Sequence, residues 1–284
     1  MVVTDAYPII LLLPNGLRYY VPSNSIRIFS ELSITRQIVP LLELPNETLS
    51  TSGLVTAHSF DTCSGSTCSD TSGLNNNLTL YRGASVTSSG CIKGNCVYFD
   101  GIDDYARFSQ NLTTILGSDY SGPLTIAFWF NSQKPSFGSS YQDNEYIYRG
   151  DGSSESTFTV RYTNISDNGP ITQPHLTVHV RGGGPKGYSY SIPHYLEPNV
   201  GWRHVVITLS SFARNTSNTI QYYINGIRYA TLSITNGNTT DMSSAGYLGV
   251  NGSFYYFTGF IDELYIYKRV LTDKEIMTLF TRTY

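Results

Sequence analysis

The stretch FDGIDDY places three aspartates, Asp100, Asp103 and Asp104, around Gly101 between two strand-like runs. Carboxylates at this spacing have two chemical uses. Asp100 and Asp103 can accept hydrogen bonds from the backbone amides of a tight turn in which Gly101 takes a left-handed conformation. Alternatively, Asp103 and Asp104 can supply two or three of the six to eight oxygens that calcium requires. We expect turn chemistry, with a calcium site as the open alternative.

A second acidic pair, Asp262 and Glu263, interrupts the strand-like run GFIDELYIY near the C-terminus. The same two uses apply to this pair. A β-bulge or a buried, hydrogen-bonded carboxylate explains the interruption without a metal ion, and we expect one of these two features.

The elements that hold these acids are predicted to be β-strands. In LTIAFWF, residues 124–130, every second side chain is large and apolar, and IQYYINGIRYATL contains Asn225-Gly226, which suits a type I′ hairpin. One helix is predicted, in LTDKEIMTLF, with Thr272 as N-cap and Glu275 as its capping-box partner. We therefore expect an antiparallel two-sheet β-sandwich with a short C-terminal helix that seals one end.

The composition argues against two kinds of partner. The chain has 18 Lys and Arg against 21 Asp and Glu, so no basic field is available for nucleic acid. The longest apolar run, residues 9–13, is far shorter than the roughly 20 residues of a membrane-spanning helix. A signal peptide has a basic residue before its apolar run, and no Lys or Arg precedes this one. We expect neither nucleic-acid binding nor a membrane span.

The cysteines form two close pairs, each with four residues between its members. This spacing favours two small disulfide-closed loops over a zinc site, although cross-pairing stays open because spacing does not fix connectivity. Together with seven Asn-x-Ser/Thr sequons, the cysteines indicate an extracellular or virion-surface glycoprotein. The cysteines are Cys63, Cys68, Cys91 and Cys96, and the sequon asparagines are Asn46, Asn77, Asn111, Asn164, Asn215, Asn238 and Asn251.

The first part of the chain differs from the rest. Residues 1–52 are predicted to form an arm with a β-hairpin in YPIILLLPNGLRYYV, and residues 53–284 a single β domain. The apolar residues of the arm need cover, either from the main domain or from another molecule, because isolated hairpins are marginal in water. A homo-oligomer or a particle joined through this arm is the expected assembly.

Five segments, in this order, resemble the LamG-like branch of the concanavalin A-like lectin/glucanase superfamily. They are GLVTAHSFD with DTSGLNNNLTLY, then CVYFDGIDDYARF, LTIAFWF, GWRHVVITL with IQYYINGIRYA, and GFIDELYIYKRVLTDKEI. The resemblance covers roughly residues 53–284. It implies a jelly-roll sandwich of two antiparallel sheets, in a family dominated by binding and adhesion modules.

Retaining enzymes on this fold carry Glu-x-Asp-x-x-Glu on one strand, whose carboxylates act as nucleophile and acid/base. The chain contains no Glu-x-Asp, no Gly-x-Ser-x-Gly and no His-Glu-x-x-His. We therefore expect no enzymatic activity.

Two sets of ligand-binding residues are expected. YQDNEYIY is similar to the calcium-bearing strand start of the pentraxins, which implies Asp143 and Asn144 as ligands of calcium, the expected cofactor. The acidic second loop of a pentraxin site has no counterpart in GVNGSFYYF. Tyrosines in aromatic loops suit stacking on sugars, with ordinary packing as the alternative. These tyrosines are Tyr188, Tyr190, Tyr195, Tyr255 and Tyr256.

The sequence thus predicts a non-enzymatic surface protein used for adhesion or recognition, with a glycan or a cell-surface protein as its partner. The alternative is a structural assembly protein of a virion or an extracellular filament, such as a spike, fibre or capsid decoration. In that case residues 1–52 would be the docking element.

Overall fold

The computed structural model describes residues 9–12, 18–21, 48–117, 120–135, 145–150, 158–163, 174–180, 188–191, 201–213, 216–235, 245–251 and 255–283. The chain divides into two compact units, Met1–Pro45 and Asn46–Tyr284. In the first unit, β1 (Ile9–Leu12) pairs with β2 (Arg18–Val21) in antiparallel orientation.

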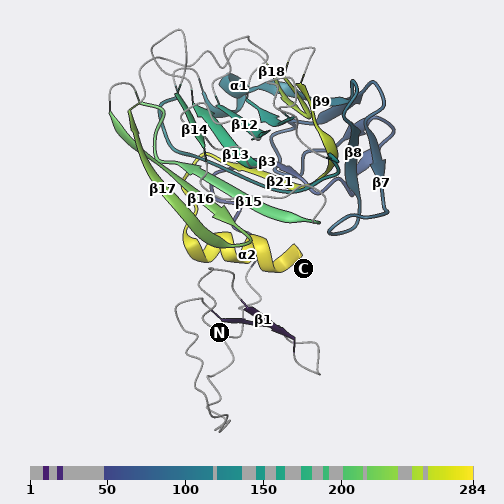
Figure 1. The fold of residues 1–284 in the computed structure, drawn as a ribbon. Coiled ribbons are helices and arrows are strands. Elements are labelled where there is room, and N and C mark those ends of the chain that lie inside the picture. The colour runs from purple at the N-terminus through teal and green to yellow at the C-terminus, as the bar shows by residue number, and fades with distance from the viewer. Residues whose placement is uncertain are drawn as a thin grey trace, which may run out of the picture. The chain divides into compact units, whose positions relative to one another are not determined.

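The second unit contains two large antiparallel sheets (Figure 1). Sheet I has eight described strands in the order β17-β16-β15-β10-β21-β8-β7, with β3 also paired to β21. They are β3 (Leu54–His58), β7 (Ser85–Thr87), β8 (Cys96–Asp100), β10 (Leu124–Ser132), β15 (Arg203–Leu209), β16 (Ser217–Ile224), β17 (Ile227–Thr235) and β21 (Thr258–Tyr267).

Sheet II has nine described strands in the order β14-β13-β12-β11-β18-β9-β6-β5-β4. They are β4 (Cys63–Ser64), β5 (Thr67–Cys68), β6 (Leu78–Tyr81), β9 (Tyr105–Asn111), β11 (Glu145–Arg149), β12 (Phe158–Thr163), β13 (His175–Val180), β14 (Tyr188–Ser191) and β18 (Ala245–Leu248). A separate pair is formed by β19 (Val250–Asn251) and β20 (Tyr255–Tyr256). The predicted jelly-roll sandwich is confirmed.

The core lies between the two sheets, because alternate side chains of each strand point inward. Phe128 and Phe130 of β10 enter it from sheet I, and Phe108 of β9 and Phe158 of β12 enter it from sheet II. At the predicted hairpin between β16 and β17, Asn225 and Gly226 both have positive φ, at 51° and 79°, as a type I′ turn requires.

The C-terminal helix α2 (Asp273–Thr283) begins with the predicted capping box. Glu275 donates its N–H to Thr272 Oγ1 at 3.3 Å, and the Thr272 N–H donates to Glu275 Oε2 at 2.9 Å. The short helix α1 (Leu112–Leu116) follows β9. Among the described residues, no helix combines the length and the apolar character that crossing a bilayer requires.

Helix α2 does not seal an end of the sandwich as the sequence suggested. It packs on the outer face of sheet I (Figure 1). There the Phe280 ring stacks on Trp129 with centroids 5.6 Å apart. Ala127 and Val206 join Ile276 and other residues of this second apolar cluster. As a result β10 and β15 are buried on both faces, whereas the alternating pattern alone predicted strands buried on one face.

Candidate ligand-binding site

Three tyrosines from three strands meet on the outer surface of sheet II. The rings of Tyr81 and Tyr105 stack with centroids 4.9 Å apart and an interplanar angle of 11°. The Tyr247 ring lies 5.9 Å from that of Tyr105, and the Arg107 guanidinium carbon lies 6.0 Å from the Tyr247 ring centroid. Tyr81 is 37% exposed, and Tyr105 and Tyr247 are half-buried. We call these four residues the tyrosine face.

Strand register brings this set together from distant parts of the sequence. Tyr81 of β6 pairs with Tyr105 of β9, and Tyr247 of β18 pairs with Arg107 of β9. Paired residues of antiparallel strands share one face of the sheet, and the next residues along each strand point to the other face. Those inward neighbours belong to the core, and they are Leu80, Ala106 and Leu248.

The chemistry of the tyrosine face follows from rings that are partly open to solvent. Flat aromatic faces pack against the C–H surface of a ligand, and phenol hydroxyls can donate or accept hydrogen bonds at its polar edge. The exposed Arg107 adds planar N–H donors beside Tyr247. The tyrosine face can therefore hold a ligand that combines C–H faces with hydroxyl groups.

The turn before β9 contains the aspartates of FDGIDDY. Gly101 has a φ of 79°, and a Cβ at this position would overlap the Thr258 hydroxyl, so the turn requires glycine. Asp100 Oδ1 accepts the N–H of Ile102 at 2.8 Å, and Asp104 Oδ2 accepts the N–H of Asp100 at 2.9 Å. The expected turn chemistry is confirmed for Asp100, but the second backbone acceptor is Asp104, where the sequence suggested Asp103.

The same three aspartates crowd negative charge next to the tyrosine face. Each offers a carboxylate oxygen that lies within 4.8 Å of the others. Arg82 Nη1 lies 3.5 Å from Asp103 Oδ2, but the two side chains are 63% and 45% exposed, so solvent screens the pair. Burial and, after it, the charges of Asp100 and Asp103 raise the pKa of Asp104.

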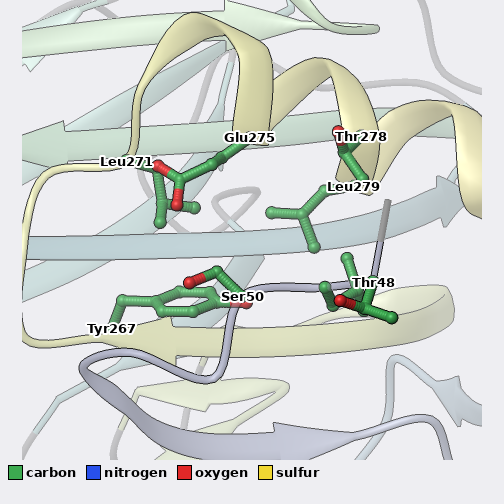
Figure 2. Close-up of a pocket in the computed structure, with 8 residues that line it drawn as sticks. Thr48, Ser50, Tyr267, Leu271, Glu275, Thr278 and Leu279 are labelled. Atoms are coloured by element: carbon green, nitrogen blue, oxygen red, sulfur yellow. The ribbon is translucent and has the colours of Figure 1, made fainter. Parts of the chain in front are cut away.

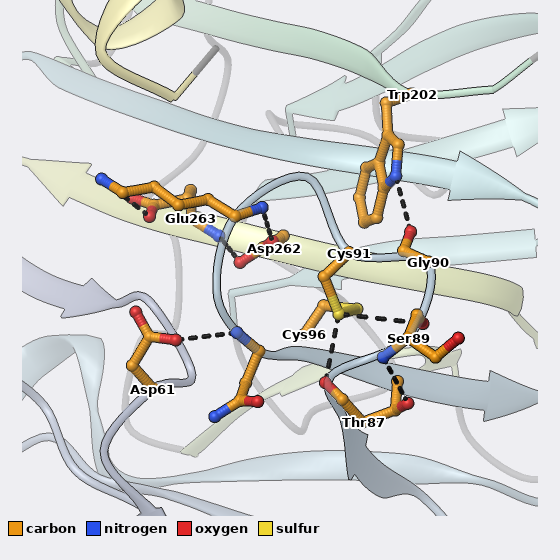
Figure 3. Close-up of a disulfide and its surroundings, with 11 residues drawn as sticks. Asp61, Thr87, Ser89, Gly90, Cys91, Cys96, Trp202, Asp262 and Glu263 are labelled. Carbon is orange, nitrogen blue, oxygen red and sulfur yellow. Dashed lines mark hydrogen bonds and ion pairs between the residues drawn. A yellow bond between two sulfur atoms is a disulfide. The ribbon is translucent and has the colours of Figure 1, made fainter.

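The second acidic pair has a different environment, beside the Cys91–Cys96 disulfide (Figure 3). Asp262 Oδ2 accepts the N–H of Lys93 at 3.2 Å, and its Oδ1 accepts the N–H of Glu263 at 2.8 Å. Glu263 has a φ of 48° at a register shift between β21 and β10. Burial raises the pKa of Asp262 to about 8. The sequence predicted either a bulge or a buried, hydrogen-bonded carboxylate, and the structure contains both.

The disulfide-closed loop reaches other neighbours as well (Figure 3). The N–H of Asn95 donates to Asp61 Oδ1 at 2.7 Å, and the Lys93 ammonium lies 3.8 Å from Glu263 Oε1. Just before the loop, the carbonyl of Gly90 accepts the indole N–H of Trp202 at 2.8 Å. This loop therefore connects several strands. The acids around it, Asp61, Asp262 and Glu263, hold it through hydrogen bonds and an ion pair. The other disulfide joins Cys63 to Cys68, so both cysteine pairs are local.

A small cavity beside α2 does not suit a large ligand (Figure 2). Its volume is about 130 Å³, against roughly 300 to 1,000 Å³ for ordinary small-molecule sites. Glu275, which lines this cavity, accepts two hydrogen bonds from the Arg269 guanidinium, at 2.6 and 2.9 Å. The cavity is lined by Thr48, Leu49, Ser50, Tyr267, Leu271, Glu275, Thr278 and Leu279.

The ligand residues expected from the sequence lie elsewhere. Tyr188 and Tyr190 are in β14, of which only the backbone is described, and Tyr195, Asp143 and Asn144 lie outside the described residues. Tyr255 and Tyr256 are half-buried in β20, paired with Asn251 and Val250 of β19. Their roles in binding remain predictions.

Two sequon asparagines have described side chains that are half-buried and hydrogen-bonded. Asn77 Oδ1 accepts the N–H of Asp70 at 2.9 Å, and Asn111 Oδ1 accepts the N–H of Thr114 at 2.8 Å as the N-cap of α1. Asn251 is described only by its backbone in β19. The other sequon asparagines, Asn46, Asn164, Asn215 and Asn238, lie outside the described residues.

The tyrosine face was missed by sequence reasoning. The signal in the sequence was the alternation of inward and outward side chains along each strand. Tyr81 follows the inward Leu80 and Tyr105 precedes the inward Ala106, so both tyrosines point outward. Alternation does not show which strands are neighbours, and Tyr247 lies more than a hundred residues away from the other two tyrosines. Pairing of β6, β9 and β18 is the information that was lacking.

A family model described as the concanavalin A-like lectin/glucanases superfamily matches residues 100–277. The chain belongs to this superfamily. The match begins in the acidic turn and includes Tyr105, Arg107 and Tyr247. No curated protein matches the sequence.

Solved structures with the superfamily's lectin-like fold include domains that bind carbohydrates or receptors. One is domain 4 of AbnA, a GH43 extracellular arabinanase from Geobacillus stearothermophilus, in complex with arabinotriose. It has a TM-score of 0.56 and 19% sequence identity, and the match covers 80% of this chain and 98% of that domain. The binding domain of botulinum neurotoxin DC in complex with rat synaptotagmin II has a TM-score of 0.60 and 16% identity, over 84% of this chain and 53% of that one. The same domain in complex with SialylT has a TM-score of 0.59 and 16% identity, over 82% and 52% of the two chains. The chain thus spans about half the length of the neurotoxin binding domains, and identities this low show a shared fold.

Proposed function

We propose that this protein is a non-enzymatic recognition module that binds glycans through the tyrosine face. The observation behind the proposal is the surface stack of Tyr81 on Tyr105, with Tyr247 and Arg107 beside it. An aromatic platform with hydrogen-bonding groups at its edge matches the alternation of C–H and O–H surfaces on a sugar.

Three further observations support this function. The similar structures include complexes with arabinotriose and with SialylT. The sequence lacks the Glu-x-Asp pattern of the retaining enzymes on this fold, which favours binding without hydrolysis. Two disulfides suit an oxidising compartment, so we infer a secreted or surface-exposed protein.

A glycan array followed by titration of the best ligand tests the site. We expect Tyr81→Ala and Tyr105→Ala each to weaken binding about tenfold or more, as loss of a central aromatic contact does. Tyr98→Ala is the matched control, because Tyr98 is a half-buried tyrosine of sheet I whose ring lies 5.0 Å from that of Phe260.

Two results would contradict this site. If no array glycan binds, the glycan proposal is wrong. If Tyr255→Ala or Tyr256→Ala abolishes binding while Tyr81→Ala leaves it unchanged, the ligand uses the aromatic loop predicted from sequence and not the tyrosine face.

A role in assembly is a second candidate, favoured by the first unit. Its antiparallel pair β1–β2 carries the apolar run IILL in β1, and a two-stranded hairpin is marginal in water unless another surface covers it. We propose that a second copy of the chain, in a particle or filament of the virion or extracellular type, provides that surface. Deleting residues 1–45 should lower the oligomer mass in light scattering while the far-UV spectrum of the second unit persists. An unchanged mass would count against assembly through this arm.

A further inference from the structure

Asp104 is a buried carboxylate with an acceptor that the turn does not use. Its residue is only 1% exposed, and its Oδ2 accepts the N–H of Asp100 at 2.9 Å. Its Oδ1 receives no hydrogen bond from the part of the chain that the structure describes. Turn chemistry therefore accounts for one oxygen of Asp104 and leaves the other without a partner, although buried carboxylates are normally paired.

Two more carboxylates stand next to the carboxylate of Asp104. Asp100, Asp103 and Asp104 each offer an oxygen within 4.8 Å of the other two. Oxygens on opposite sides of one calcium ion are about 4.6 to 5.2 Å apart, given the usual calcium–oxygen distance. Three carboxylate oxygens this close can therefore share one ion, and water or backbone carbonyls can complete a shell of six to eight ligands.

The positive charge found beside the cluster is poorly placed to neutralise it. Arg82 reaches Asp103 alone, at 3.5 Å, and its side chain is 63% exposed. It makes this contact from the solvent side, whereas the unmet oxygen of Asp104 is buried. Within the described residues, no other ion pair involves the three aspartates.

We propose that Asp100, Asp103 and Asp104 form a binding site for a hard divalent cation, with calcium as the preferred ion. Oxygen ligands on an irregular turn suit calcium, which accepts variable geometry, better than magnesium, which demands an octahedron. The bound ion would fix the turn that leads directly into Tyr105. This inference goes beyond glycan binding, and its test uses no glycan.

Terbium, which replaces calcium at oxygen sites, provides a direct test. Tyr105 is adjacent to Asp104, and Tyr81 stacks on it, so excitation of these tyrosines should sensitise the emission of a terbium ion held by the cluster. We expect saturable emission that calcium displaces at lower concentration than magnesium does. Calcium alone should also raise the unfolding temperature, and a chelator should reverse the rise.

Variants of the cluster separate this site from other surface acids. Asp104→Asn and Asp103→Asn should each weaken calcium binding at least about tenfold, and Asp103 is exposed enough for its variant to fold normally. Asp61→Asn is the matched control, because this exposed aspartate lies outside the cluster and an amide oxygen can still accept the N–H of Asn95.

Removing the competing cation should have the opposite effect. Arg82→Ala frees Asp103 and should tighten calcium binding about two- to fivefold, the range of an exposed ion pair. A merely structural cluster would not respond in this way. The proposal is overturned if terbium gives no sensitised emission, or if Asp103→Asn and Asp104→Asn bind calcium as well as the wild type does.

Discussion

Asp104 and Asp262 are both buried aspartates in short acidic runs, at 1% and 0% exposure, yet their surroundings differ. Both oxygens of Asp262 accept backbone N–H groups, one of them from the disulfide-closed loop at Lys93. Asp104 has a backbone donor at one oxygen and none, among the described residues, at the other. The sequence motifs look alike, but Asp262 completes a network within the protein, whereas Asp104 leaves an acceptor for something else.

The largest effect on stability should come from opening the disulfide-closed loop whose Lys93 N–H donates to Asp262. Replacing Cys91 and Cys96 by Ser should lower the free energy of unfolding by about 2 kcal/mol through loop closure, and by about 1–3 kcal/mol more because the buried carboxylate loses a donor. Urea unfolding measures the difference.

The other disulfide is the natural control for this experiment. Cys63 and Cys68 close a loop with the same sequence separation of 5, between β4 and β5. Replacing this pair by Ser should lower the free energy of unfolding only by the loop-closure contribution of about 2 kcal/mol. Equal losses for the two disulfides would show that the bond from Lys93 to Asp262 adds nothing to stability.

A smaller effect should distinguish the two aspartates themselves. Asp262→Asn should lower the free energy of unfolding by about 1–3 kcal/mol, because an amide has one acceptor oxygen for two buried N–H donors. With a chelator present, Asp104→Asn should change stability by less than about 1 kcal/mol or increase it, because it removes one of three crowded charges. Equal destabilisation by both changes would make Asp104 a structural acid like Asp262.

Much of the fold could be predicted from local patterns. Alternation in LTIAFWF, the Asn225-Gly226 turn and the capping box at Thr272 are each determined by neighbouring residues, and each is present. The place of α2 could not be predicted in this way. Its apolar stripe had to pack somewhere, but only the position of Trp129 on the outside of sheet I shows where.

The candidate site was less accessible to sequence reasoning. The acidic turn was visible as FDGIDDY, because its residues are consecutive. The tyrosine face depends on β6, β9 and β18 lying side by side, and the unmet oxygen of Asp104 depends on how the carboxylate is buried. Both are consequences of long-range packing, which single-chain periodicity does not encode.

The packing of α2 on sheet I gives the sandwich two unlike sides. The chain passes along α2 at Thr48 and Ser50, which line the small cavity there. Tyr81, Tyr105 and Tyr247 belong to the outer face of the other sheet. A contact made through the helix-covered side would thus leave the other side of the sandwich open to solvent. Its tyrosines would be displayed toward an approaching cell or polymer, which is an orientation suited to capture at a surface.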